Sequence, residues 1–342
     1  RVNTFWIISL ALFLTIFSIT ETSTADTRQY SISGQTMGTV YTVKFIADTG
    51  LSLKVWEKKL SVLLRDVNQK LSMFDPKSEL SRFNEAPVDQ PVKVSSDFFS
   101  ILSTAGQIHE LTGGSWDGTV KPLVDLWGFG ILKNSHHVPE HHQIAKALAN
   151  TGFGHIQRIP PQTVQKNRAV TLDLGSIAKG YGVDKVLQLF QTNGIQDVLV
   201  ESGGELSAAG KNLQGEHWRV GINRPDTGYQ HQNLFTVLRL ENQAIATSGD
   251  YRNFFTENGK TYTHVIDPAT GYPIETSIIS VSVISDTCTF ADGLATGLMV
   301  MDVNSALALV NQIDKTECLI ITRKNNRLAS HFSRNFNRAV VQ

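Results

Sequence analysis

The alternation of hydrophobic and polar positions divides the chain into extended and helical stretches. Apolar and polar residues alternate over residues 30–46 around a Gly-Gln-Thr-Met-Gly interruption, which predicts two short strands or a bent hairpin. Apolar residues then recur at helical spacing over residues 53–71, before Pro76 enforces a stop. The same spacing predicts a second helix at residues 98–111, which ends at a pair of glycines.

The second half of the chain mixes strands with helices. Helical patterns cover residues 177–190 and 290–309, and a shorter helix is expected near residues 144–149. Strands are expected near Val198, Trp218, Phe235, Ala244, Thr261, Ile278 and Leu319. Because most links between these strands are short and contain Gly or Asn, we expect antiparallel pairing. The pattern therefore favours an α+β fold, with mixed, mainly antiparallel sheets and packed helices, over a doubly wound parallel sheet.

Residues 169–180 are read as a strand, a turn and a helix. Gly175 and Ser176 permit a tight turn at the helix start, where free N–H groups favour an anion, and Lys179 adds a cation one turn later. Asp173 would repel a bare phosphate, so it fits best beside a hard cation or a hydroxyl-bearing ligand. The alternative is that Asp173 is only a turn residue and Lys179 only a solvated charge.

The composition is that of a globular protein of one large domain or two intimate ones. Its 342 residues include 31 basic and 31 acidic side chains, and this formal neutrality argues against nucleic acid as a partner. Cys288 and Cys318 are the only cysteines, and they are either a bridge or two buried thiols.

The first residues have the layout of an export signal. An apolar run at residues 5–17 follows Arg1, and Ser23 and Ala25 supply small residues at a cleavage site. The run is shorter than the roughly 20 residues of a spanning helix. We expect residues 1–25 to be a signal peptide or an uncleaved membrane anchor, with a single domain at residues 29–340.

Two further segments carry candidate chemistry. Asp292 and Thr296 are four residues apart and share one face of a helix, where their oxygens suit magnesium better than zinc. They could instead be a helix-dipole partner and a hydroxyl bonded back to its own helix. His264 precedes a Pro- and Gly-bounded turn in which Asp267 or Thr270 could form local hydrogen bonds. This histidine is either a proton acceptor or a packed strand residue.

In combination these segments resemble the ApbE family of FAD:protein FMN transferases, also called flavin transferases. The resemblance spans most of the chain and is carried by residues 36–39, 71–84, 116–123, 173–180, 201–204, 248–251, 264–271 and 291–296. It implies an ApbE-like, T-fold-related architecture. It also implies a Mg²⁺-dependent enzyme that cleaves FAD, attaches the FMN half to a threonine hydroxyl of an acceptor flavoprotein through a phosphoester bond, and releases AMP.

The resemblance assigns roles to individual residues. The implied FAD contacts are Met37, Phe74, Ser115, Trp116, Asp117, Asp173 and Lys179, with Val265 or Ile266 near the ligand. Ser176, through its backbone carbonyl, would join Asp292 and Thr296 as metal ligands, and His264 would activate the acceptor hydroxyl. At Phe74 the family commonly has tyrosine, so stacking on the flavin would survive without the hydroxyl.

Two other functions use the same residues. One is an FAD pyrophosphatase, in which water replaces the threonine and the products are FMN and AMP. The other is a non-enzymatic FAD-binding protein. The family also suggests an acceptor that is a subunit of a membrane redox complex, and hence an exported protein in the periplasm, attached to the inner membrane if its N-terminal segment is not cleaved.

Overall fold

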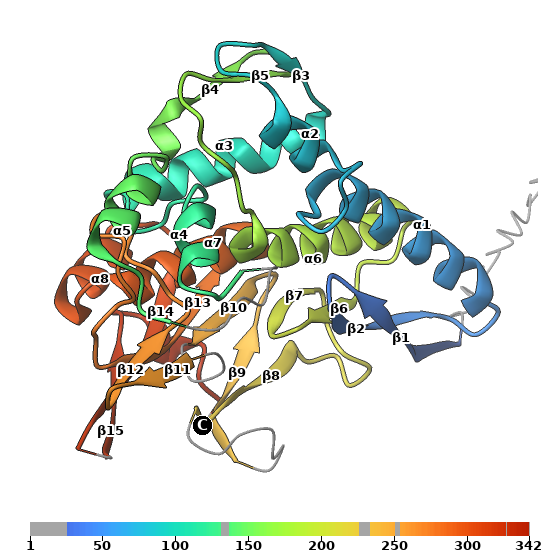
Figure 1. The fold of residues 1–342 in the computed structure, drawn as a ribbon. Coiled ribbons are helices and arrows are strands. Elements are labelled where there is room, and N and C mark those ends of the chain that lie inside the picture. Colours follow the sequence, from blue (N-terminus) through green and yellow to red (C-terminus); the bar gives the residue numbers. More distant parts are fainter. Residues whose placement is uncertain (1–25, 131–136, 226–232, 250–253, 326, 342) are drawn as a thin grey trace, which may run out of the picture.

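The core of the molecule is one large antiparallel sheet (Figure 1). The computed structural model describes residues 26–130, 137–225, 233–249, 254–325 and 327–341. Eight strands form the sheet in the order β1-β2-β6-β7-β10-β13-β14-β15, and each neighbouring pair is antiparallel. The predicted α+β fold with mainly antiparallel sheets is therefore confirmed.

The helices and strands follow one another along the whole described chain. The helices are α1 (Leu53–Leu71), α2 (Glu79–Glu85), α3 (Ser96–Leu111), α4 (Lys121–Leu126), α5 (His141–Leu148), α6 (Gly175–Thr192), α7 (Cys288–Val300) and α8 (Val303–Val310). The strands of the large sheet are β1 (Thr27–Thr36), β2 (Thr39–Asp48), β6 (Val198–Ser202), β7 (Glu205–Ala209), β10 (Ala244–Gly249), β13 (Ile278–Ser285), β14 (Glu317–Lys324) and β15 (Arg327–Phe332). Smaller sheets contain β3 (Val92–Lys93), β4 (Ile156–Ile159) and β5 (Thr163–Lys166), then β8 (Trp218–Asn223) with β9 (Leu234–Leu240), and β11 (Phe254–Glu257) with β12 (Lys260–Thr263).

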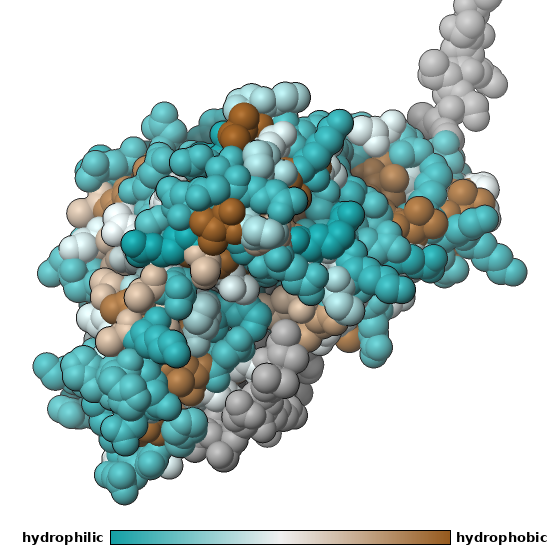
Figure 2. Space-filling view, turned by 45° about the horizontal axis from the view of Figure 1, so that its top comes forward, coloured by the Kyte–Doolittle hydropathy of each residue, from teal (hydrophilic) through white to brown (hydrophobic). Residues whose placement is uncertain are grey.

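The two faces of the large sheet are covered differently. Helices α1, α6 and α7 lie along one face, and α3 packs on α6 and α7 from the side away from the sheet (Figure 1). The β8–β9 hairpin packs on the opposite face, where its apolar residues join those of β10, β13 and β14 in one cluster. Strand β13 is buried along its whole length because both faces are covered. In the view of Figure 2, hydrophobic side chains at the surface are scattered among hydrophilic ones.

Most of the predicted elements are present. The helix at Leu53–Leu71 has its predicted bounds, the hairpin is β1–β2, and each predicted strand site lies in or beside a strand. The predicted strand at residues 169–174 is wrong. No strand is assigned to these residues. The Asn84 side chain takes the place of a neighbouring strand, since its amide oxygen accepts the N–H of Leu172 at 2.8 Å and its amide nitrogen donates to the Leu172 carbonyl at 2.9 Å.

The single helix predicted at residues 290–309 is also wrong, because two helices occupy it. Helix α7 ends at Val300, and α8 begins at Val303. Asp302 lies between them and caps α8, since its carboxylate accepts the N–H groups of Asn304 and Ser305, each at 3.0 Å. A side chain that satisfies these first N–H groups favours a new helix start over continuation.

Two expectations about the termini and the cysteines can be placed. The predicted signal or anchor at residues 1–25 lies outside the described residues, and within the described ranges no helix is long and apolar enough to cross a membrane. Cys288 and Cys318 are free, buried thiols, which is one of the two alternatives left open by the sequence.

A charged cluster ties three helices together beside the core. Asp97 of α3 lies 2.6 Å from the ammonium of Lys70 in α1, and it accepts hydrogen bonds from Tyr181 at 2.7 Å and Lys185 at 3.2 Å in α6. Burial alone would raise the pKa of Asp97, but these three donors outweigh it and lower the pKa to about 2. The carboxylate is therefore held ionised at the junction of α1, α3 and α6.

We expect Asp97→Asn to lower the free energy of unfolding by about 1–2 kcal/mol at neutral pH. A carboxyl group whose pKa is lowered in the folded state stabilises the fold at pH values above its ordinary pKa of 3.8. This contribution is lost as the pH falls toward the lowered pKa of about 2. Urea unfolding at pH 7 and near pH 2.5 should show the difference between wild type and variant shrinking. Asp66→Asn, which removes the more exposed partner of Lys70, is the control and should cost less than about 0.5 kcal/mol. An equal loss in both variants, or a pH-independent difference, would contradict the assignment.

Candidate functional site

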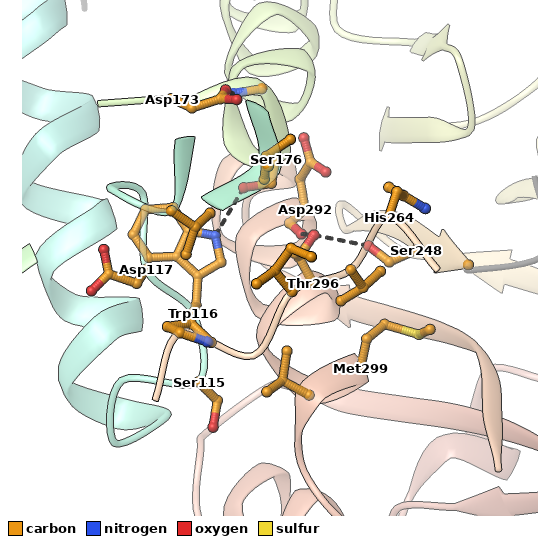
Figure 3. A pocket seen from close by; sticks show the side chains of 18 of the residues that line it. Ser115, Trp116, Asp117, Asp173, Ser176, Ser248, His264, Asp292, Thr296 and Met299 are labelled. Carbon is orange, nitrogen blue, oxygen red and sulfur yellow. Dashed lines mark hydrogen bonds between the residues drawn. The ribbon is translucent and has the colours of Figure 1, made fainter. Parts of the chain in front are cut away.

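A cavity of ≈ 420 Å³ opens where α6 and α7 meet the ends of β7 and β10. Its remaining walls come from the loop before α4 and from the segment after β12. In Figure 3 Asp292 lies between Ser176 on one side and His264 with Ser248 on the other. The volume is within the range of small-molecule sites.

The cavity brings together most of the residues selected from the sequence. Eleven of them line it: Ser115, Trp116, Asp117, Asp173, Ser176, Lys179, His264, Val265, Ile266, Asp292 and Thr296. The described residues that line the cavity do not include Met37 and Phe74. Met37 lies in the β1–β2 turn and packs beside Gly182 of α6, whereas Phe74 is 72% exposed. Their contact with FAD stays a prediction.

Close approach of α6 and α7 creates the oxygen cluster in the cavity. Gly180 makes this approach possible, since a Cβ there would lie only 2.3 Å from the carbonyl oxygen of Cys288. The N–H of Gly180 donates to Asp292 Oδ2 at 2.9 Å, although in a regular α-helix this N–H faces the carbonyl of Ser176. Asp292 thus competes with the Ser176 carbonyl for its usual donor.

A second pair of oxygens adjoins this cluster. Thr296 lies one turn after Asp292 and donates a long hydrogen bond of 3.3 Å to the Asp292 carbonyl. This is the bond back to its own helix that the sequence left open as an alternative role for Thr296. Its hydroxyl is also 3.0 Å from Ser248 Oγ on β10 (Figure 3). The threonine oxygen is therefore fixed in place between α7 and the sheet.

The charges at the cavity wall are unequal. The ammonium of Lys179 lies 2.5 Å from Glu205 Oε1 and 3.8 Å from Asp292 Oδ1, so two buried carboxylates share one ammonium. Burial raises the pKa of Asp292 well above its ordinary value, Lys179 opposes this, and Glu205 adds to it. Burial alone would lower the pKa of Lys179, but Asp292 and Glu205 raise it. With both carboxylates ionised, the cluster would have one negative charge that Lys179 does not balance, and a bound cation would neutralise it.

The donor set suits a hard divalent cation. Asp292 offers a carboxylate, Thr296 a hydroxyl and Ser176 a backbone carbonyl, and oxygen ligands of these kinds bind Mg²⁺ better than Zn²⁺. Among the described residues no group of three or more His, Cys, Asp and Glu side chains could hold a metal. A site here would therefore depend on the hydroxyl, the carbonyl and groups of the substrate.

Three of the predicted ligand contacts have structural partners. The carboxylate of Asp117 accepts the N–H of Thr119 at 2.7 Å and that of Phe153 at 2.8 Å, and it points away from Asp292 in Figure 3. The indole N–H of Trp116 donates to Ser176 Oγ at 3.0 Å. Asp173 Oδ1 accepts the N–H of Gly175 at 2.8 Å, as expected of a turn residue.

The histidine lies at the cavity, directly before a hydrogen-bonded turn. His264 follows β12 and lines the cavity, and its ring packs edge-on against Phe129. The predicted local hydrogen bonds are present, because Asp267 accepts the N–H of Ala269 and the hydroxyl of Thr270, each at 2.9 Å. The turn can therefore hold His264 opposite the oxygen cluster.

Sequence reasoning gave no role to two of the polar residues in the cavity wall. Glu205 begins β7 directly after the Gly203-Gly204 turn, and Ser248 lies near the end of β10. Glu205 directly follows the Glu-Ser-Gly-Gly motif at residues 201–204, and Ser248 is the first residue of the Ser-Gly-Asp-Tyr motif at residues 248–251. Both motifs contributed to the family resemblance. Only the pairing of strands shows that both side chains reach the cavity.

Comparison with known proteins gives a consistent result. The model of the ApbE family matches residues 37–320. The FAD:protein FMN transferase of Haemophilus influenzae is 38% identical over 330 residues, covering 93% of each chain. The flavin transferase ApbE from Vibrio cholerae superposes with a TM-score of 0.83 at 36% identity, covering 92% of this chain and 100% of the other. The apo flavinyl transferase ApbE of Pseudomonas stutzeri has the same TM-score at 32% identity, with 92% and 97% covered.

Proposed function

The chain belongs to the ApbE family, and we propose that it is an FAD:protein FMN transferase. The observation that carries this proposal is the oxygen cluster of Asp292, Thr296 and the Ser176 carbonyl beside Lys179, with His264 at the same cavity. Phosphoryl transfer depends mainly on charge neutralisation and on in-line placement of the reacting groups, and this cavity supplies residues for both.

The reaction exchanges the phosphoanhydride bond of FAD for a phosphoester bond to the acceptor. The acceptor threonine Oγ attacks the phosphorus on the FMN side of the FAD pyrophosphate, the bond to the bridging oxygen breaks, and AMP leaves with that electron pair. His264 takes the proton of the threonine hydroxyl. Lys179 and the N-terminal turn of α6 stabilise the negative charge that develops on the phosphates.

We further propose that Mg²⁺ is held by Asp292, Thr296 and the Ser176 carbonyl. The ion would supply positive charge to the pyrophosphate oxygens when FAD is bound. The two buried carboxylates that share one ammonium and the oxygen-only donor set support this choice.

The function is tested by incubating the protein with FAD and Mg²⁺, with and without a flavoprotein fragment that carries the acceptor threonine. We expect flavin fluorescence to stay on the acceptor in a denaturing gel, with one AMP released for each flavin attached. Free FMN without labelled acceptor would identify a pyrophosphatase instead. Bound FAD without AMP release would identify a flavin-binding protein.

We also propose that the acceptor is a subunit of a membrane redox complex and that the transfer occurs in the periplasm. The apolar run at residues 5–17, followed by small residues at positions 23 and 25, supports export. Fractionation of cells that produce the full chain would test this proposal. Recovery in the cytoplasmic fraction would refute it.

A further inference from the structure

Glu205 occupies a constrained position in the cavity wall. It is the first residue of β7, after a two-glycine turn in which Gly203 and Gly204 have φ angles of 69° and 110°. Two positive φ values are the geometry of a type I′ hairpin turn, which glycine adopts without strain. The turn fixes Glu205 opposite Ser202 on β6, and the side chain is 3% exposed.

The carboxylate of Glu205 is committed to Lys179. Its Oε1 lies 2.5 Å from the Lys179 ammonium, while Oε2 has no hydrogen-bond partner among the described residues. A buried carboxylate with one unpaired oxygen is costly unless a cation is close, and Lys179 is the cation that lies beside Glu205 in this wall.

Lys179 has a second carboxylate within reach. Asp292 Oδ1 is 3.8 Å from the same ammonium, and Asp292 is also the carboxylate proposed to bind the divalent cation. An ammonium that moved onto Asp292 would occupy the lone pairs that the cation needs and would cancel its charge. The shorter distance to Glu205 shows which carboxylate holds the ammonium in this structure.

We propose that Glu205 is a positioning residue that holds Lys179 away from Asp292 and thereby keeps Asp292 available for a divalent cation. This inference rests on the proposed function, since it assumes the cation site. Without Glu205, Lys179 becomes an intramolecular competitor for Asp292. Competition of this kind weakens cation binding and is overcome by a high cation concentration.

The test measures Mn²⁺ binding in the absence of FAD, by electron paramagnetic resonance of free Mn²⁺, on the intact protein. Mn²⁺ takes oxygen ligands like those of Mg²⁺. We expect Glu205→Gln, which keeps the shape and removes the charge, to weaken binding by about tenfold. Glu201→Gln removes a charge from the neighbouring strand, where the carboxylate accepts the N–H of Gly204, and it should change binding by less than about twofold.

Replacement of Lys179 distinguishes two causes of weaker Mn²⁺ binding in Glu205→Gln. One is competition of Lys179 for Asp292, and the other is loss of the negative charge of Glu205 alone. Lys179→Met combined with Glu205→Gln should bind Mn²⁺ several-fold more tightly than Glu205→Gln alone. If Glu205→Gln does not fold, Lys179→Met by itself tests the same point and should bind Mn²⁺ more tightly than wild type. In transfer assays Glu205→Gln should raise the half-saturating Mg²⁺ concentration about tenfold while keeping most of the rate at saturating Mg²⁺.

Several results would overturn the proposal. They are wild-type affinity in Glu205→Gln, equal losses in Glu205→Gln and Glu201→Gln, and no recovery when Lys179 is also replaced. Failure of the cation site itself looks different, because wild-type protein would then not bind Mn²⁺, or Asp292→Asn would bind it as tightly as wild type does.

Discussion

Asp292→Asn should lower Mg²⁺-dependent AMP release and flavin transfer by at least about 10³-fold, because the metal contributes several kcal/mol of transition-state stabilisation. The amide keeps an oxygen that can still accept the N–H of Gly180, so the contact between α6 and α7 has a replacement. What is lost is the negative charge that attracts the cation. AMP release measured by chromatography and labelled acceptor measured in a gel should fall together.

The same substitution should not weaken the fold when no divalent cation is present. Two buried carboxylates share one ammonium in the wild type, and removal of one charge relieves that imbalance. Thermal unfolding in a chelating buffer should therefore show a melting temperature equal to or above that of wild type. Asp286→Asn, an exposed aspartate before α7 that pairs with Lys315, is the activity control and should keep normal turnover. Normal turnover in Asp292→Asn would contradict the proposal that Asp292 binds Mg²⁺.

His264→Ala should lower the rate of flavin transfer about 10²–10⁴-fold, which is the usual range for loss of a positioned general base. FAD and Mn²⁺ binding should stay near wild type, because His264 is not among the proposed ligands of either. Single-turnover transfer to the acceptor separates the chemical step from binding. Added imidazole should restore part of the rate, since the truncated side chain leaves room beside the turn that follows β12.

His142→Ala provides the matched control for the histidine. His142 lies on the exposed face of α5 and does not line the cavity, so transfer should be unchanged. A normal transfer rate in His264→Ala would show that another group accepts the threonine proton. Loss of FAD binding in the same variant would assign His264 to binding.

Local sequence signals predicted the fold where local interactions determine it. The first long helix was predicted with its bounds because its apolar spacing and the following proline agree. The strand predicted before α6 was wrong, because hydrogen bonds to this segment come from the Asn84 side chain, which is far away in the sequence. The break between α7 and α8 was not predicted, because the apolar spacing continues across it. Asp302, which caps α8, marks the break.

The candidate site divides in the same way. Asp292 and Thr296 could be paired from the sequence alone, since four residues on a helix make one turn. Glu205 and Ser248 could not be placed together from the sequence, because they lie on different strands. Their positions at the cavity depend on the order of the strands in the sheet. Likewise, nothing local in the sequence shows that Gly180 lies against the carbonyl of Cys288.

The wall of the cavity is assembled from segments that span more than half of the chain, from Ser115 to Val300. Contacts between such distant segments form slowly during folding, because long loops must close before the contacts can stabilise the chain. The cavity is complete only where α7 packs on α6 and on strands β10 and β13. A nascent chain released before α7 has been synthesised could contain the β1–β2 hairpin and the first helices, yet it would lack the capacity to bind the cation.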